Sequence, residues 1–218
     1  MSPVVLAEQP WLVLNKASGM SVHNAQPGEL DLVGWLRREG RHERPVHRLD
    51  KGTSGLVLCA SGEAAAQVGA WFVGGEVRKT YLALVAGRAR PKGVVRRALK
   101  EGGKRVEAVT RYLRLEQLGG FALLELRPQT GRKHQIRRHL ASIGLPLVGD
   151  SRYGPRRPRR VPGFPGRLWL HALRLELPDR SRFEAPLAPE LAAHLELLRQ
   201  SRTGGPEGPP VTPKGEEA

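Results

Sequence analysis

A single carboxylate lies in a strongly basic turn at the start of residues 47–60, HRLDKGTSGLVLCA. Asp50 has His47, Arg48 and Lys51 as sequence neighbours, and an apolar run follows within a few residues. Positive neighbours stabilise an ionised carboxylate, which suits a nucleophile or a base better than a proton donor. A polar loop before a buried strand holds a functional side chain on a rigid support. An isolated Asp more often caps its turn, so the assignment depends on the accompanying motifs.

A second basic segment covers residues 130–154, TGRKHQIRRHLASIGLPLVGDSRYG. Ile136, Leu140 and Ile143 recur at the spacing of one helical face, and Gly144 ends the predicted helix.

Cations gather near the start of that helix, where they can point into a cleft: Arg132, Lys133, Arg137 and Arg138. In most helices such residues form a solvated face. His134 and His139 are five residues apart and therefore lie on different faces, which argues against a zinc pair.

A tyrosine beside basic residues, Lys79-Thr80-Tyr81, stands on a predicted strand at residues 77–87. Such a ring can stack on a splayed-out nucleobase, because every base offers a π face. A strand Tyr is more often half-buried core, so Tyr81 gains meaning only from the motifs around it.

The remaining pattern predicts a mixed fold. Expected elements are a hairpin at residues 4–14, helices at 30–38, 63–73 and 191–198, and strands at 106–116, 121–127 and 170–177. Strand pairs with helices between them predict an α+β class with a mainly antiparallel sheet. Residues 1–200 are expected to form one domain, and the Gly- and Pro-rich residues 201–218 a disordered tail.

The charge balance points to a polyanion. The 218 residues include 36 Lys and Arg against 21 Asp and Glu, a net charge of +15, which favours nucleic acid over a membrane surface. The basic, Pro-rich residues 153–167 either contact phosphate or form a solvated insertion. The only cysteine, Cys59, cannot form an intrachain disulfide. With no evident signal peptide or long apolar span, a cytoplasmic protein is expected.

Taken together, HRLD, K-x-Y and TGRKHQIR resemble the motifs of the RluA family of RNA pseudouridine synthases, in the branch with His before Arg. Residues 15–23 and the FEAPL segment at 183–187 resemble further family motifs, so the resemblance covers about nine-tenths of the chain. It implies a long bent antiparallel sheet with flanking helices and a central catalytic cleft. It begins within the first residues, which leaves no room here for an N-terminal S4 domain.

The resemblance also implies site roles. Asp50 is the catalytic carboxylate, Arg137 salt-bridges it, and Tyr81 stacks on the base and takes its C5 proton. Arg48 fills the space left by the extruded base, and Ile136 packs against the tyrosine. The expected substrate-binding residues are His47, Arg48, Arg132, His134, Gln135 and Ile136. Isomerisation needs no cofactor or metal, and the expected state is a monomer acting on ribosomal or transfer RNA.

Two other functions remain in view. A catalytically silent RNA-binding protein, such as an RNA assembly factor, could use the same scaffold, although such a protein should have lost Asp50 or its partners. A nucleoside hydrolase using Asp50 and His47 would have no reason for the large positive charge. The motifs leave open which uridine is modified, and whether Asp50 attacks C1′ or removes the 2′ proton.

Overall fold

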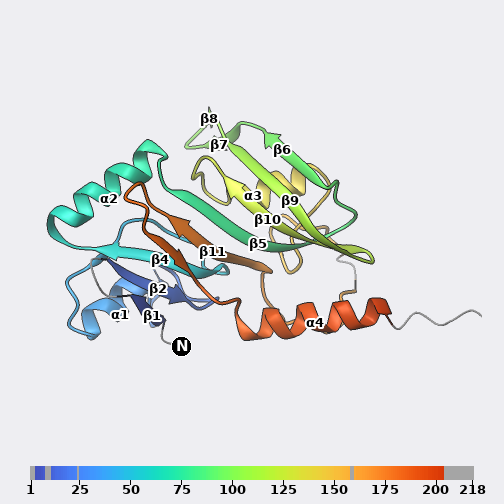
Figure 1. Ribbon diagram of the computed structural model, residues 1–218, viewed down its shortest axis with the longest axis horizontal. Coiled ribbons are helices and arrows are strands. Elements are labelled where there is room, and N and C mark those ends of the chain that lie inside the picture. Colours follow the sequence, from blue (N-terminus) through green and yellow to red (C-terminus); the bar gives the residue numbers. More distant parts are fainter. Residues whose placement is uncertain (1–2, 8–10, 24, 158–159, 204–218) are drawn as a thin grey trace, which may run out of the picture.

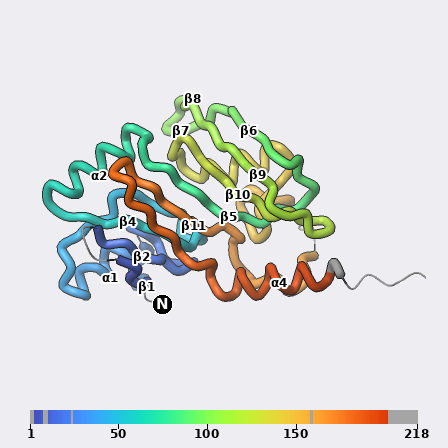
Figure 2. Tube along the Cα trace, in the orientation of Figure 1, coloured from blue at the N-terminus to red at the C-terminus, as the bar shows by residue number. Residues whose placement is uncertain are grey.

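The computed structural model describes residues 3–7, 11–23, 25–157 and 160–203. They form a ten-stranded sheet, a two-stranded hairpin and four helices (Figure 1, Figure 2). In chain order the elements are β1 (Val4–Ala7), β2 (Leu12–Lys16), α1 (Leu32–Arg38), β3 (Arg44–Pro45), β4 (Ser54–Ala60), α2 (Gly62–Gly74), β5 (Arg78–Ala86), β6 (Lys92–Arg96), β7 (Leu99–Glu101), β8 (Lys104–Val106), β9 (Val109–Leu118), β10 (Phe121–Pro128), α3 (Gln135–Ser142), β11 (Leu170–Glu176), β12 (Arg182–Glu184) and α4 (Pro189–Thr203). No helix within these ranges is long and apolar enough to cross a membrane.

The large sheet has the strand order β1-β2-β4-β11-β5-β10-β9-β6, with β3 paired to β4 and β12 paired to β11. β11 runs parallel to β4, and the other described pairings are antiparallel. The predicted α+β class with a mainly antiparallel sheet is confirmed.

The parallel contact joins the N-terminal strands to the rest of the sheet. Ser54 and Gly55 on β4 pair with His171 and Ala172 on β11. Gly55 has a φ of 109°, and a Cβ at this position would collide with the backbone of Ala172. Only glycine allows both the backbone conformation and this close approach. The strand that follows Asp50 is therefore held at the middle of the sheet.

Helices cover the sheet with their apolar faces (Figure 1). Val68 of α2 packs in a core cluster with β4, and Leu140 of α3 packs in a cluster with β5 and β10. Leu191 and Leu195 of α4 pack with Trp169, the residue before β11. All seven residues of β4 are buried, so the strand behind the catalytic turn is fully enclosed.

Several predicted boundaries need correction. The hairpin is confirmed by the β1–β2 pairing, although its turn, residues 8–10, lies outside the described residues. The predicted strand 106–116 is wrong at its start, because Val106 belongs to the β7–β8 hairpin and β9 begins at Val109. Sequence patterns also missed β6, whose residues alternate too weakly to signal an edge strand.

Two helix ends also differ from expectation. α4 continues to Thr203, so the first three residues of the predicted tail are helical, and residues 204–218 lie outside the described part of the chain. α3 stops at Ser142, and Ile143 is its C-terminal cap with 42% exposure. Ile143 therefore does not continue the apolar stripe of Ile136 and Leu140.

Candidate active site

Asp50 lies in the turn before β4, and the loop after β2 fixes this turn from behind. The Gly19 amide donates to the Lys51 carbonyl at 2.8 Å. Ser18 Oγ donates to the Gly52 carbonyl, also at 2.8 Å. These bonds cross from one loop to the other, so the backbone that carries Asp50 has little freedom to move.

Lys16 reinforces the same contact from inside the protein. Its side chain is fully buried, and Nζ donates to the Met20 carbonyl at 2.8 Å and to the Lys51 carbonyl at 3.4 Å. Burial and the charge of Arg167 lower the pKa of Lys16 to about 7, although the Asp50 charge acts in the opposite direction. Sequence reasoning gave Lys16 no role beyond its motif.

The cations next to Asp50 in sequence do not pair with it, which corrects the expected basic turn. Lys51 Nζ lies 2.7 Å from a carboxylate oxygen of Glu29. Arg48 Nη1 lies 3.1 Å from His23 Nε2, and its side chain is exposed. Both side chains therefore leave the Asp50 carboxylate to partners from elsewhere in the chain.

His47 is neutral and is held by the protein. Its Nε2 accepts a hydrogen bond from the Leu58 amide at 3.0 Å, and its ring stacks on Phe72 with centroids 4.5 Å apart. Burial, together with the charge of Lys79, lowers the pKa of His47 to about 3. The ring thus adds no positive charge beside Asp50 at neutral pH.

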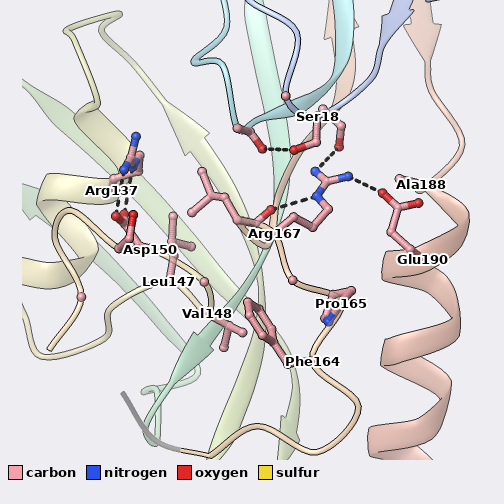
Figure 3. Close-up of a pocket in the computed structure, with 18 of the residues that line it drawn as sticks. Ser18, Arg137, Leu147, Val148, Asp150, Phe164, Pro165, Arg167, Ala188 and Glu190 are labelled. Carbon is pink, nitrogen blue, oxygen red and sulfur yellow. Dashed lines mark hydrogen bonds and ion pairs between the residues drawn. The ribbon is translucent and has the colours of Figure 1, made fainter. Parts of the chain in front are cut away.

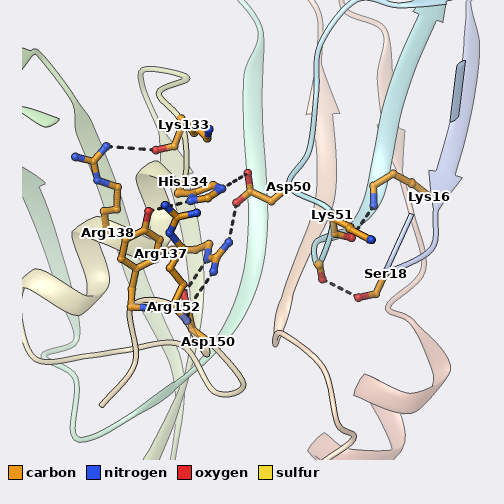
Figure 4. Close-up of polar contacts among 12 residues, drawn as sticks. Lys16, Ser18, Asp50, Lys51, Lys133, His134, Arg137, Arg138, Asp150 and Arg152 are labelled. Atoms are coloured by element: carbon orange, nitrogen blue, oxygen red, sulfur yellow. Dashed lines mark hydrogen bonds and ion pairs between the residues drawn. The ribbon is translucent and has the colours of Figure 1, made fainter. Parts of the chain in front are cut away.

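The charge that faces Asp50 comes from the start of α3 (Figure 4). Arg137 Nη1 lies 3.6 Å from Asp50 Oδ2, so the predicted ion pair is present. His134 Nε2 lies 3.7 Å from Asp50 Oδ1. The Asp50 side chain remains 20% exposed and can accept further hydrogen bonds from a ligand.

Arg137 is shared with a second carboxylate, Asp150. Its Nε and Nη2 donate to the two Asp150 oxygens at 2.9 and 2.8 Å. Asp150 Oδ1 also accepts from the amides of Arg152 and Tyr153, each at 3.0 Å. Although burial opposes it, these donors hold the Asp150 pKa below its usual range. Asp150 was not among the predicted site residues, and its signal was the GDSRYG string behind the helix.

His134 begins α3 in a left-handed conformation, with a φ of 54°. Its Nδ1 lies 2.9 Å from the Tyr153 hydroxyl, and its ring meets Tyr153 edge-on. Burial is the main cause that lowers the pKa of His134. Arg137 in turn stacks over the Tyr153 ring at 5.1 Å, so Tyr153 braces both groups that face Asp50.

Tyr81 stands on β5 opposite Ala172 of β11 and Leu126 of β10. Its ring packs against the buried cluster that contains Ile136. Burial and the negative charge of Asp50 raise the pKa of Tyr81, so it is a neutral phenol at physiological pH.

The start of α3 is fastened to β9 through Gln135, which is 4% exposed. Its Nε2 donates to the Val109 carbonyl at 2.9 Å, and its Oε1 accepts from Thr130 Oγ1 at 2.6 Å. Arg132 is exposed, and its Nε donates to the Glu107 carbonyl at 3.2 Å. The Gln135 amide therefore bonds to protein groups, whereas Arg132 is exposed.

All of the predicted site residues line one cavity of about 820 Å³. The lining also includes residues that were not predicted as site residues, among them Phe72 at the end of α2, whose helical spacing resembles ordinary core, and Thr130, which bonds Gln135. Asp50, Arg137 and Tyr81 thus share one chamber that a single nucleotide can enter.

Relatives of known identity carry the same region. A family model for RNA pseudouridylate synthase matches residues 10–142. A tRNA pseudouridine synthase C from Salmonella typhimurium is 34% identical over 205 residues, covering 79% of each chain. A protein of the same name from Pectobacterium carotovorum is 34% identical over 210 residues, and this chain spans only 55% of its length. A ribosomal large subunit pseudouridine synthase C from Vibrio parahaemolyticus is 32% identical over 91% of this chain and 70% of that one.

A solved structure agrees. Human RNA pseudouridylate synthase domain containing 4 superposes with a TM-score of 0.74 at 28% identity, covering 89% of this chain and 92% of that chain. The motifs, the fold and the cavity that contains the predicted site residues all support the same family. The chain belongs to the RluA family of RNA pseudouridine synthases, isomerases that convert uridine in RNA into pseudouridine.

Proposed function

We propose that Asp50 acts on the ribose of a uridine that has been flipped out of its RNA. The observation that carries this proposal is the Asp50 carboxylate, 20% exposed in the 820 Å³ cavity and 3.6 Å from the Arg137 guanidinium. The glycosidic bond is out of reach in a stacked helix, so extrusion must come first and costs a few kcal/mol. Arg137 holds the carboxylate in position, whether Asp50 attacks C1′ or removes the 2′ proton.

Tyr81 stacks on the uracil and receives the C5 proton at the end of the reaction. Its raised pKa means that no phenolate is ready in the free protein. The hydroxyl therefore accepts the C5 proton only as it passes its own proton on. The product gains a proton on N1 in place of the one lost from C5, so the proton that Tyr81 releases ends on N1.

The other residues around the cavity divide into two groups. Arg48 and Arg132 are exposed and would bind the RNA, with Arg48 filling the space left by the flipped base. His47, Gln135 and Ile136 act by positioning, because protein partners engage their polar atoms or bury the side chain. His134 faces Asp50 and lies between these groups.

We propose tRNA as the substrate class, with a monomeric protein working in the cytoplasm. Several relatives are named tRNA pseudouridine synthase C, which supports tRNA, and one is named a ribosomal large subunit enzyme. Ribosomal RNA is therefore the competing outcome of the same experiment.

The test incubates the protein with unmodified total tRNA and, separately, with unmodified ribosomal RNA. Pseudouridine is then mapped by chemical adduct formation and reverse-transcription stops, with the Asp50→Asn protein as the matched control. New stops in tRNA that depend on Asp50 support the proposal. If the stops are confined to ribosomal RNA, the substrate is ribosomal RNA and not tRNA. Tight RNA binding without any new pseudouridine would favour the silent RNA-binding alternative.

A further inference from the structure

A second cavity, of about 1740 Å³, lies beside the catalytic one and shares Arg137 with it (Figure 3). Its walls include the loop after β2, residues between 146 and 156 and between 160 and 168, and the first residues of α4. The chemistry assigned to Asp50 and Tyr81 uses none of the residues between 155 and 168. This large space next to the reacting base is therefore unexplained by the isomerisation itself.

One wall carries an aromatic side chain that is not buried. Phe164 is 44% exposed and lines the cavity. The ring edge lies against Gly149, where an added Cβ would come within 3.0 Å of ring atom Cε2. Burial of a phenyl ring away from water is favourable in free energy, and an exposed ring obtains this stabilisation only when a ligand covers it.

The turn that presents Phe164 is anchored by a buried polar chain. Trp169 Nε1 donates to His194 Nδ1 at 3.0 Å, and His194 Nε2 lies 2.9 Å from the Pro162 carbonyl. His194 is 3% exposed, and burial lowers its pKa, which agrees with a neutral ring that accepts on one side and donates on the other. Gly163, at a φ of 60°, packs on Leu197 of α4. The backbone turn that carries Phe164 is thus anchored to α4.

The cavity also has an excess of positive charge. Arg152, Arg156 and Arg160 line it, and none of them has a carboxylate partner among the described residues. The two acids on its walls are already neutralised, Asp150 by Arg137 and Glu190 by Arg167. Pro158 and Arg159, part of the predicted basic loop, lie outside the described residues.

We propose that this cavity binds a single-stranded nucleotide of the same RNA that flanks the target uridine. Its base stacks on Phe164, and its phosphate lies among Arg156 and Arg160. Stacking suits any base, and arginines bind phosphate through charge-assisted hydrogen bonds. Arg137 lines both cavities, so the two sites are neighbours, and adjacent nucleotides of one strand occupy them. This inference rests on the proposed action on RNA.

Photocross-linking locates the strand directly. The whole protein is irradiated with a short oligouridylate that contains 4-thiouridine, and tryptic peptides are identified by mass spectrometry. Cleavage after Arg160 and Arg167 releases VPGFPGR, which carries Phe164, and cleavage after Lys79 and Arg88 releases TYLALVAGR, which carries Tyr81. Both peptides are expected to be labelled.

Affinity for the same oligouridylate gives the second readout. Phe164→Ala should weaken binding about tenfold, because one base loses its stacking partner, and Phe164→Tyr should restore it. Replacing Arg156 and Arg160 by Ala should flatten the slope of log K against log salt by about 1.4, roughly 0.7 for each lost contact. The charge-matched control replaces Arg37 and Arg38 of α1, which line neither cavity.

The outcomes separate this inference from the function on which it rests. Labelling of the Tyr81 peptide alone, or unchanged affinity in Phe164→Ala, overturns the second nucleotide site while the uridine chemistry stands. A control double variant with the same flattened slope as the Arg156/Arg160 variant also overturns it, because general charge would then explain the binding. Absence of pseudouridine formation by the parent protein rejects the proposed function instead.

Discussion

Asp50 and Asp150 lie in different loops and both face the Arg137 guanidinium, but their carboxylates differ in hydrogen bonding and exposure (Figure 4). The Asp150 side chain is 1% exposed and accepts two hydrogen bonds from Arg137 and two from backbone amides. The Asp50 side chain is 20% exposed, lies 3.6 Å from Arg137 and accepts no hydrogen bond from the described residues. A saturated carboxylate anchors structure, whereas one with free lone pairs can act on a ligand.

The difference lies in which elements hold each carboxylate. Asp150 folds back on its own turn through the amides of Arg152 and Tyr153, so it meets Arg137 at full hydrogen-bonding distance. Asp50 is held by its backbone, through contacts from the loop after β2, and its side chain is left unused. The Asp150 pair thus fixes Arg137 at a set distance from Asp50.

The strongest test of this contrast is Asp50→Asn. Turnover should fall at least about 10³-fold, because the amide cannot act as nucleophile or base. Stability should change by less than about 1 kcal/mol, because the Asp50 carboxylate makes only long contacts, at 3.6 Å to Arg137 and 3.7 Å to His134. Tritium release from RNA labelled at uridine C5 measures the rate, and thermal unfolding measures the stability. Substantial tritium release would end the catalytic role of Asp50.

Tyr81→Phe extends the comparison to a neighbouring group, because the charge of Asp50 helps to raise the pKa of Tyr81. The ring can still stack, but no hydroxyl remains to move the C5 proton, so the rate should fall about 10²- to 10⁴-fold. RNA affinity, measured by filter binding, should stay near that of the parent protein. If tritium release is nearly unchanged, Tyr81 is a stacking platform only.

Asp150→Asn should show the opposite profile to Asp50→Asn. Loss of the charge that binds Arg137 should cost about 2 kcal/mol of folding free energy and lower Tm by about 5 °C. The rate should fall only about tenfold, because Arg137 remains beside Asp50 with a less defined position. Calorimetry and the tritium assay check both parts. An intact Tm together with a rate as low as that of Asp50→Asn would make Asp150 the more critical carboxylate.

The last prediction concerns the response of stability to acid. His47 is neutral in the folded state, with a pKa of about 3, and has an ordinary value near 6.5 when unfolded. The unfolded chain therefore binds the extra proton first, so this contribution to stability is complete above pH 6.5 and is lost as pH falls toward 3. His47→Gln keeps an acceptor for the Leu58 amide and does not titrate. Its unfolding free energy should depend less steeply on pH in urea titrations, by about 1.4 kcal/mol per pH unit; equal slopes would contradict the assignment.

The local patterns predicted the sheet class and most strands, whereas the predicted residues around the cavity came from the resemblance to the family motifs. They failed where contacts between distant segments decide the outcome. The cations around Asp50 in sequence point to Glu29 and His23, whereas its actual partner is Arg137. No local pattern reports that exchange, because it depends on how α3 packs on β5 and β10.

The sequence also could not show whether a polar residue in a motif contacts the substrate or bonds to other protein groups. Gln135 and Asp150 stand in motifs that indicate a functional site, but only the fold shows that protein groups use their polar atoms. Phe164 gave no signal either, because one phenylalanine in a Pro- and Gly-rich segment has no periodicity to interpret.

The parallel contact between β4 and β11 has a consequence for how the enzyme is made. Ser54 pairs with His171, so β4, the strand after Asp50, cannot complete its pairing until the ribosome has synthesised β11. Pairings between such distant segments form slowly, and synthesis adds only about 5–20 residues per second. A growing chain therefore carries its catalytic carboxylate for several seconds without the strand that completes its support. The catalytic turn is therefore fully supported only after β11 has been synthesised.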